Sequence, residues 1–176
     1  MARTRTTYYI VTAVVRQGNQ LLLVEQKGKG ESAASWALPG GVVEPGETVL
    51  EALTREVLEE TSLHVLEPGR PAYVVQIDGY VGESSTIVFA FDVGRWDGSP
   101  QANDPDGLVS DSRFFALDQA LRMLRCLPSR EWYEPVSAYL SAEPSSTTLW
   151  MYRRQLDGST LLVGRSPADL TVPRRD

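Results

Sequence analysis

The segment from Glu47 to Thr61 restricts the fold of this 176-residue chain more than any other, because it predicts one amphipathic helix with an unusual charge distribution. Thr48 and Glu51 have the spacing of a capping box, which satisfies backbone N–H groups where a helix begins. Further along, apolar side chains recur at helical intervals and therefore share one face that would pack against a sheet. These apolar residues are Leu50, Leu53 and Val57.

Three glutamates, Glu56, Glu59 and Glu60, lie on a neighbouring arc in the last turns of this helix. Glu56 and Glu60 are like charges one turn apart, and such pairs destabilise a helix. Glu59 and Glu60 also lie where the helix dipole disfavours anions, by about 0.3–1 kcal/mol each. A bound cation would offset both costs, and carboxylate oxygens favour Mg²⁺, with Mn²⁺ as a substitute.

Arg55 offers a second explanation of these charges. It lies one turn from Glu51 and one turn from Glu59, so a solvated ladder of ion pairs, worth roughly a few tenths of a kcal/mol each, would also form. The ladder explains Glu47 and Glu51 better than it explains the three later glutamates. Charge and periodicity alone leave a solvated acidic face and a metal site both open.

The turn before the helix favours the metal site. Gly40, Gly41 and Gly46 permit backbone conformations and close approaches that larger residues forbid. A glycine-rich turn that runs into the start of a helix is a plausible phosphate cradle, although this signal is weak when it stands alone.

The rest of the chain has mainly the pattern of short strands separated by polar turns. Strands are expected at 8–16 and 20–26, paired as a hairpin, and at 63–66, 71–77, 85–93 and 112–117. A tight turn is expected over 36–46 and a loop over 97–111, followed by helices at 117–127 and 131–142. A last hairpin, 147–155 with 159–163, would turn at Asp157-Gly158. Strands on both sides of the main helix predict an α+β fold with helices against a sheet.

Composition limits what the chain can bind. The net charge of −6 argues against a protein that grips nucleic acid by its phosphates, although a cation could mediate binding of a phosphorylated small molecule. No apolar run approaches the roughly 18 residues of a membrane helix, so no membrane partner is expected. The single cysteine, Cys126, fits a reducing compartment, and a cytoplasmic protein is expected. The single histidine, His64, is expected to be structural or at the surface rather than catalytic.

The residues from Gly41 to Leu63 have a fixed spacing that resembles the box of the Nudix hydrolase family. The matching positions are Gly41, Glu47, Arg55, Glu56, Val57, Glu59, Glu60 and Leu63. The lead-in 36–41 is also similar to that family. Ser62 departs from the pattern, because the family has a glycine there that ends the helix in a left-handed conformation. A serine at that position is expected to cost on the order of 1 kcal/mol.

The resemblance implies the Nudix fold, a mixed β-sheet sandwiched between α-helices, over residues 1–144. Residues 145–176 would then form a C-terminal extension, a β-hairpin and a tail, docked on the same domain. The implied activity is Mg²⁺-dependent hydrolysis of a pyrophosphate bond in a nucleoside diphosphate linked to another group. Nucleoside triphosphates, nucleotide sugars and dinucleoside polyphosphates are such substrates. A monomer or a homodimer is expected.

The resemblance also implies roles for single residues. The three glutamates of the last turns, Glu56, Glu59 and Glu60, would bind the metal and carry catalysis. Arg55 would belong to the catalytic group by positioning these glutamates through salt bridges. Gly40, Gly41 and Glu47 would form the substrate-binding part, where the glycines shape the metal and phosphate site and Glu47 steadies the turn or holds an outer water.

Two other functions remain open. One is a sensor module of Nudix fold that binds a nucleotide metabolite without cleaving it, although such modules often lose the glutamates that are intact here. The other is an isomerase of isoprenoid diphosphates, which has a related fold and needs an active-site cysteine. Cys126 lies in an apolar helical segment and is expected to be buried packing instead.

Residues outside the box carry weaker signals. A general base could come from Asp104, Asp106, Asp111 or Glu83, but aspartates in loops rich in proline and glycine usually shape turns. Tyr80 lies 17 residues past the box, where some dinucleoside-polyphosphate enzymes carry a tyrosine. Lys27 and Lys29 could reach a phosphate from a loop. Four aromatic residues could stack on a base but are expected to pack in the core, namely Tyr8, Tyr9, Tyr73 and Phe91.

Overall fold

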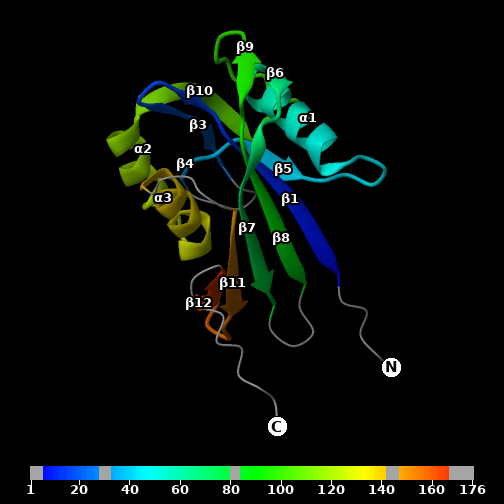
Figure 1. The fold of residues 1–176 in the computed structure, drawn as a ribbon, viewed down its shortest axis with the longest axis vertical. Coiled ribbons are helices and arrows are strands. Elements are labelled where there is room, and N and C mark those ends of the chain that lie inside the picture. Colours follow the sequence, from blue (N-terminus) through cyan, green and yellow to red (C-terminus); the bar gives the residue numbers. More distant parts are fainter. Residues whose placement is uncertain (1–5, 28–32, 80–83, 142–146, 167–176) are drawn as a thin grey trace.

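The computed structural model describes residues 6–27, 33–79, 84–141 and 147–166, and its largest feature is a six-stranded sheet (Figure 1). In spatial order the strands are β12 (Thr160–Ser166), β11 (Thr148–Arg154), β7 (Arg70–Asp78), β8 (Ser85–Asp92), β1 (Thr7–Val14) and β5 (Gly40–Val42). Strand β1 is parallel to β8 and β11 is parallel to β7, whereas the other neighbours are antiparallel. The sheet is therefore mixed, as expected.

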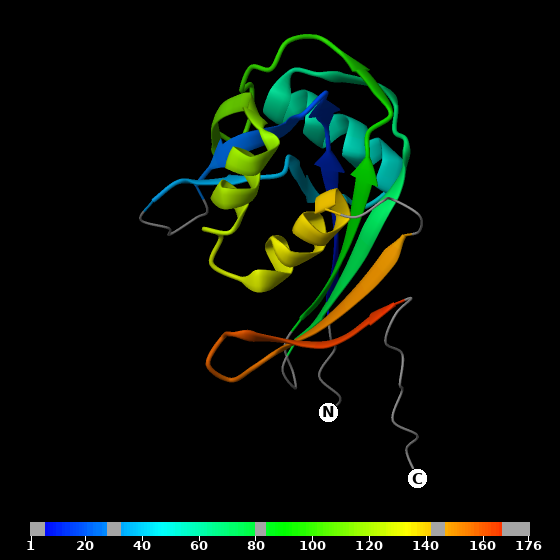
Figure 2. The same ribbon diagram turned by 60° about the vertical axis from the view of Figure 1, so that its left-hand side comes forward.

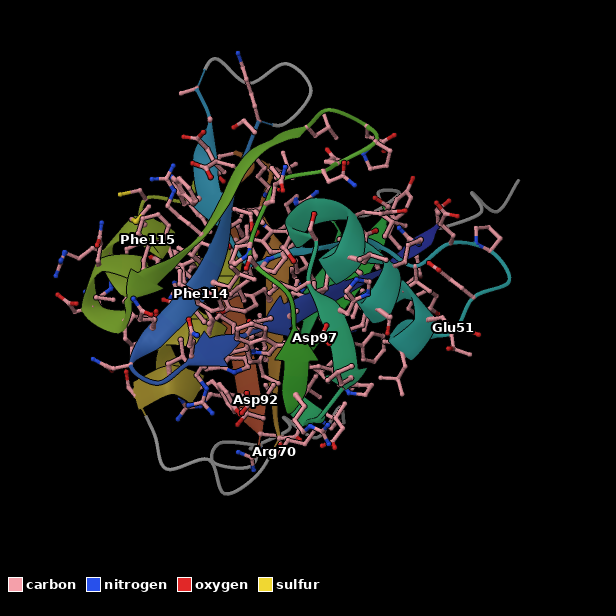
Figure 3. All side chains as sticks on the ribbon, turned by 90° about the horizontal axis from the view of Figure 1, so that it is seen from above. Glu51, Arg70, Asp92, Asp97, Phe114 and Phe115 are labelled. Carbon is pink, nitrogen blue, oxygen red and sulfur yellow. The ribbon has the colours of Figure 1, made fainter. Side chains whose placement is uncertain are left out.

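Two smaller sheets complete the strand pairing. One contains β10 (Val109–Ala116), β3 (Gln20–Gln26) and β2 (Arg16–Gln17), and β4 (Ser35–Ala37) also pairs with β3. The other joins β6 (His64–Glu67) to β9 (Arg95–Asp97). Aromatic pairs join strands of these smaller sheets, since Phe114 of β10 stacks on Trp96 of β9 and Phe115 packs edge-on against Trp36 of β4. Figure 3 labels both phenylalanines on β10.

Helices cover the six-stranded sheet on both sides (Figures 1 and 2). On one side lies α1 (Val49–Thr61), and on the other lie α2 (Leu117–Leu124), the 3₁₀ turn η1 (Arg130–Trp132) and α3 (Glu134–Ser141). Successive side chains of a strand point to opposite faces, so β1 serves both cores. Val11 and Ala13 pack in the cluster that contains Leu53 of α1, whereas Val14 belongs to the cluster that contains Val136 of α3. This confirms the α+β architecture of a sheet between helices.

Several local expectations were wrong. The strand expected at 8–16 does not pair with 20–26 as one long hairpin, because β1 joins the large sheet and only the two residues of β2 pair with β3. The expected turn over 36–46 instead contains β4 and β5, and β5 pairs with β1. The expected loop over 97–111 overlaps the end of β9 and the start of β10. Helix 131–142 is divided into η1 and α3.

The hairpin at Asp157-Gly158 forms as expected, from β11 and β12. Its first strand extends the large sheet by pairing with β7, and its side chains Trp150 and Tyr152 are buried in the α3-side core. The hairpin therefore packs on the same sheet as the rest of the chain.

Candidate functional site

Helix α1 begins and packs largely as its sequence indicates. The Thr48 hydroxyl accepts a hydrogen bond from the Glu51 N–H at 3.3 Å, and the Glu51 carboxylate accepts from the Thr48 N–H at 2.7 Å, which confirms the capping box. Figure 3 shows Glu51 at the outer end of this helix. Leu53 and Val57 are fully buried, but Leu50 is 44% exposed, so its expected packing on the sheet was wrong. The packed face runs through Leu53 and Val57 to Thr61 instead.

Glu60 lies in the interior next to the glycine turn. Only 7% of its surface is exposed, and its carboxylate accepts a hydrogen bond from the Gly40 N–H at 2.8 Å. Burial, reinforced by the negative charges of Glu56, Asp104 and Glu59, raises the pKa of Glu60 to about 8. The carboxylate therefore occupies a place where its charge needs a counter-charge.

Gly41 leaves room for the carboxylate of Glu56. A Cβ atom at position 41 would lie 2.2 Å from Glu56 Oε1, so any side chain there would displace the carboxylate. Burial also raises the pKa of Glu56, although the neighbouring Arg55 guanidinium works in the opposite direction. Gly40 approaches the backbone of β1 instead, because its Cβ would lie 2.1 Å from the Val11 carbonyl oxygen.

Arg55 connects the carboxylates around the turn. Its guanidinium donates to Glu47 at 2.7 and 3.2 Å, to Glu56 at 2.9 Å and to Glu59 at 3.1 Å. It also donates to the Val42 carbonyl at 3.1 Å. The expected ladder through Glu51 was wrong on one side, because the Glu51 carboxylate caps the helix and Glu47 takes its place at Arg55.

Glu47 joins the turn to helix α1. Its carboxylate accepts from Arg55 and also from the Glu44 N–H at 2.7 Å, and these hydrogen bonds hold the pKa of Glu47 below the usual range. Turn and helix are thus tied together by one guanidinium and one carboxylate.

The donor set fits a divalent cation that prefers oxygen. Three carboxylates gather within two turns of α1, one of them buried, and carboxylate oxygens are the ligands that Mg²⁺ and Mn²⁺ favour. Among the described residues, however, no three His, Cys, Asp or Glu side chains lie close enough together to ligate one ion as they stand. Each of these carboxylates instead accepts from a donor of the protein, Glu56 and Glu59 from Arg55 and Glu60 from the Gly40 N–H.

The raised pKa of Glu60 predicts how stability changes with pH. A carboxyl that binds its proton more tightly in the folded than in the unfolded chain costs stability as pH rises from about 4.5 to 8. In chelator, Glu60→Gln is therefore expected to melt several degrees above wild type at pH 8.5, and this gap should narrow at pH 5. Thermal melts of both proteins across this range check the prediction, and a variant no more stable than wild type at pH 8.5 would contradict it. Mg²⁺ at pH 8.5 should raise the melting temperature of wild type more than that of the variant.

Ser62 ends α1 in the left-handed conformation that a glycine would adopt, with φ 57° and ψ 14°. Its N–H donates to the Leu58 carbonyl at 2.9 Å, and its hydroxyl donates to the Gln101 carbonyl at 3.0 Å. The Gln101 N–H in turn donates to the Thr61 carbonyl at 2.9 Å. The side-chain hydrogen bond offsets part of the conformational cost, so the helix end keeps the geometry that the departure from the box had put in doubt.

Two substitutions separate these opposing effects. Ser62→Ala keeps the left-handed strain and loses the hydrogen bond to Gln101, so it is expected to destabilise by about 1 kcal/mol. Ser62→Gly loses the same bond but relieves the strain, and is expected to lie within about 0.5 kcal/mol of wild type. Urea unfolding of the three proteins measures the difference, and equal stabilities for the alanine and glycine variants would rule out this balance.

The candidate general bases have local roles in turns and strands. The Asp104 carboxylate accepts from the N–H groups of Asp106, Leu108 and Val109, and Asp106 itself is exposed. Asp111 accepts from its neighbour Ser112 and pairs with Arg113. Asp104 nevertheless lies close enough to Glu60 for its charge to raise the Glu60 pKa. Glu83, Tyr80 and Lys29 lie outside the described residues.

A cavity of about 310 Å³ opens beside Gly40 and Gly41, between the sheet and the α2–η1 connection. Lys27 and Tyr73, both considered from the sequence, line it. Glu131 and Trp132 of η1 also line it, and sequence reasoning missed both, since they had the pattern of an ordinary helix start. The volume lies within the roughly 300–1,000 Å³ of small-molecule sites.

The aromatic candidates and His64 lie in the core or at the surface. Tyr73, which also lines the cavity, and Phe91 pack in the core as expected, but Tyr8 and Tyr9 are each 49% exposed, so that expectation was wrong for them. Their side chains belong to the outer end of β1, beyond the part of the strand whose residues are fully buried. His64 is exposed on β6.

Cys126 is also exposed, and its expected burial was wrong because α2 ends at Leu124, before the cysteine. It does not line the cavity. Among the described residues, no helix is long and apolar enough to cross a membrane.

Comparisons with known proteins agree with the geometry. A family model described as NUDIX domain matches residues 6–139. Over 56 residues the chain is 50% identical to an 8-oxo-dGDP phosphatase of Homo sapiens. These 56 residues cover 32% of this chain and only 17% of that protein's length. Over 100 residues it is 29% identical to a CTP pyrophosphohydrolase of Escherichia coli, covering 57% of this chain and 72% of that protein. The solved structure of a mutator MutT protein from Bacillus halodurans has the same fold, with a TM-score of 0.66 and 20% identity over 90% of this chain and 95% of that one.

Proposed function

Since the chain belongs to the Nudix family, we propose that it is a Mg²⁺-dependent hydrolase that cleaves a pyrophosphate bond in a nucleoside diphosphate linked to a further group. The observation that carries this proposal is the buried carboxylate of Glu60. It lies against the glycine turn, beside Glu56 and Glu59, where a negative charge is costly unless a cation shares it. A domain that only had to display acidic residues to solvent would not bury one of them.

In this proposal each residue of the site has a separate task. Glu56, Glu59 and Glu60 would hold the cation, and Arg55 would keep the first two of them in place through its hydrogen bonds. Gly40 and Gly41 would let the pyrophosphate approach closely, because neither carries a side chain. Glu47 would act as a support of the turn. When bound, Mg²⁺ would neutralise the pyrophosphate and lower the pKa of the attacking water.

The substrate could be a nucleoside triphosphate, a nucleotide sugar or a dinucleoside polyphosphate. The relatives differ in the nucleotides that their names state, 8-oxo-dGDP for one and CTP for another. Both names state a nucleotide in which phosphates are joined to one another, which supports the reaction class more than any one base. The exposed thiol of Cys126 suits the reducing cytoplasm in which the enzyme would act.

The test is a panel of nucleoside triphosphates, nucleotide sugars and dinucleoside polyphosphates incubated with the protein and Mg²⁺, with and without chelator. Release of a nucleoside monophosphate or phosphate that chelator abolishes is expected for at least one compound. A compound that raises the melting temperature without being cleaved, together with no turnover of any compound, would favour the sensor function instead.

A further inference from the structure

The cavity beside the glycine turn has the character of a binding site for a flat, mostly apolar group. Its walls include apolar side chains from β1, β7 and β8, among them Ile10, Val75 and Val88. The half-buried indole of Trp132 adds an aromatic surface on which a heterocycle can stack. Gly40 and Gly41 belong both to this cavity and to the carboxylate site, so the two sites adjoin at the glycine turn.

A buried carboxylate gives this cavity its chemical selectivity. Glu131 is only 4% exposed, and it is the one acidic side chain among the described residues that line the cavity. A phosphate would be repelled by it, whereas N–H groups of a neutral heterocycle would be accepted. A carboxylate is an acceptor at both oxygens, so it matches an edge with two adjacent N–H donors.

The C-terminal hairpin fixes the position of this carboxylate. The hydroxyl of Thr160, on β12, donates to Glu131 Oε2 at 2.5 Å, and both residues are buried. One turn along, Glu134 accepts from the Tyr152 hydroxyl of β11 at 2.9 Å and from Arg130 at 2.7 and 3.0 Å. The hairpin lies beyond residue 139, where the family match ends. This segment therefore adds a contact that the matched region does not contain.

We infer that the cavity takes the base of the nucleotide substrate, that Glu131 selects a guanine-type edge with two adjacent N–H donors, and that Thr160 of the C-terminal hairpin is the positioning residue for Glu131. The inference rests on the proposed function and names the base that this site prefers. Adenine and cytosine present an N–H donor beside an acceptor nitrogen on the corresponding edge, so a carboxylate would face one repulsive lone pair with either of them.

Turnover of GTP, ITP, ATP and CTP by wild type tests the base preference. GTP is expected to have the highest kcat/KM, and ITP, which lacks the amino group of guanine, should be about 10-fold lower. Glu131→Gln replaces one acceptor by a donor, so it should lower kcat/KM for GTP about 10- to 100-fold and remove the preference over ATP. An unchanged ratio of GTP to ATP in Glu131→Gln would overturn the assignment of Glu131.

The role of Thr160 is tested by a pair of variants. Thr160→Val keeps the shape and removes the hydroxyl, so KM for GTP should rise about 10-fold with kcat nearly unchanged. Thr160→Ser restores a hydroxyl and should restore the KM. A loss of kcat for all four nucleotides alike, or a valine variant with the selectivity of wild type, would overturn the positioning role.

A binding experiment in chelator separates this inference from the proposed hydrolysis. Calorimetric titration with GMP, IMP, AMP and CMP measures the cavity without turnover. GMP is expected to bind most tightly, with its affinity reduced about 10-fold or more in Glu131→Gln. GMP binding that depends on Glu131, without turnover of any nucleotide, would uphold the cavity and overturn the hydrolase. Turnover by wild type with no preference for guanine would uphold the hydrolase and overturn the assignment of the cavity.

Discussion

Glu60→Gln is expected to lower Mg²⁺-dependent turnover by roughly 100-fold or more, because it removes a negative oxygen donor from the centre of the carboxylate cluster. The amide oxygen of glutamine can still accept from the Gly40 N–H, so the fold around the turn should survive. Glu59→Gln should have an effect of similar size, because Glu59 belongs to the same group of three carboxylates, although its side chain is partly exposed. Steady-state kinetics on the best nucleotide of the panel, at saturating Mg²⁺, measures both variants.

A matched control lies on the same helix. Glu51→Gln makes the same change of charge, and glutamine also serves in a capping box, so the start of α1 should be kept. This variant is expected to retain turnover within about twofold of wild type, because the Glu51 carboxylate accepts from the N-cap Thr48 and, among the described residues, has no hydrogen bond to Arg55. Near-normal activity in Glu59→Gln or Glu60→Gln would sink the metal assignment, and equal losses in all three variants would point to a general effect of charge.

The pH dependence of stability adds a second signature for Glu60. The same substitution that removes turnover should stabilise the protein in chelator above pH 8, because it removes a charge that burial makes costly. A residue needed only for folding would show the opposite, a variant that is inactive because it is unstable. The two measurements together distinguish a functional carboxylate from a structural one.

The helix that carries the chemistry could be predicted closely from the sequence, because its determinants are local. The capping box of Thr48 and Glu51 and the buried side chains Leu53 and Val57 are fixed by spacing alone. Periodicity indicated the face of the glutamates and the pair of Arg55 with Glu59, but not the partner of Arg55 on its N-terminal side. That partner, Glu47, is eight positions away, and only the path of the turn brings it there.

Features that depend on contacts distant in sequence could not be predicted in this way. Gly40 to Val42 form a strand because β1 offers a free edge, and nothing within the segment itself shows this. Glu131 gains its place in the cavity from Thr160, 29 positions later, and its own neighbours in sequence show only a helix start. Strand order and buried polar pairs of this kind are decided by packing between elements rather than by propensity.

Alanine at the two glycines of the turn is expected to separate folding from function. In Gly41→Ala the atoms nearest to the new Cβ are those at the end of a flexible side chain, Glu56, so the fold should persist while the carboxylate is displaced. Turnover should fall roughly 100-fold. In Gly40→Ala the Cβ would meet the backbone of β1, 2.1 Å from the Val11 carbonyl oxygen and 2.8 Å from the Thr12 Cα. Neither atom can rotate away, so a loss of roughly 2–4 kcal/mol of stability is expected.

Gly46→Ala completes the comparison in the same turn. Gly46 has φ +98°, but apart from its two chain neighbours no atom of the described residues lies within 4 Å of the position that its Cβ would take. Backbone strain alone should cost about 1–2 kcal/mol there, with turnover largely kept. Urea unfolding measures the stability of each of the three variants, and steady-state kinetics measure its turnover. The site as described requires a folded but slow Gly41→Ala, an unstable Gly40→Ala and a mildly destabilised, active Gly46→Ala. If Gly41→Ala is fully active, the close packing of Glu56 against Gly41 has no part in holding the cation, and the substrate must approach the glutamates from elsewhere.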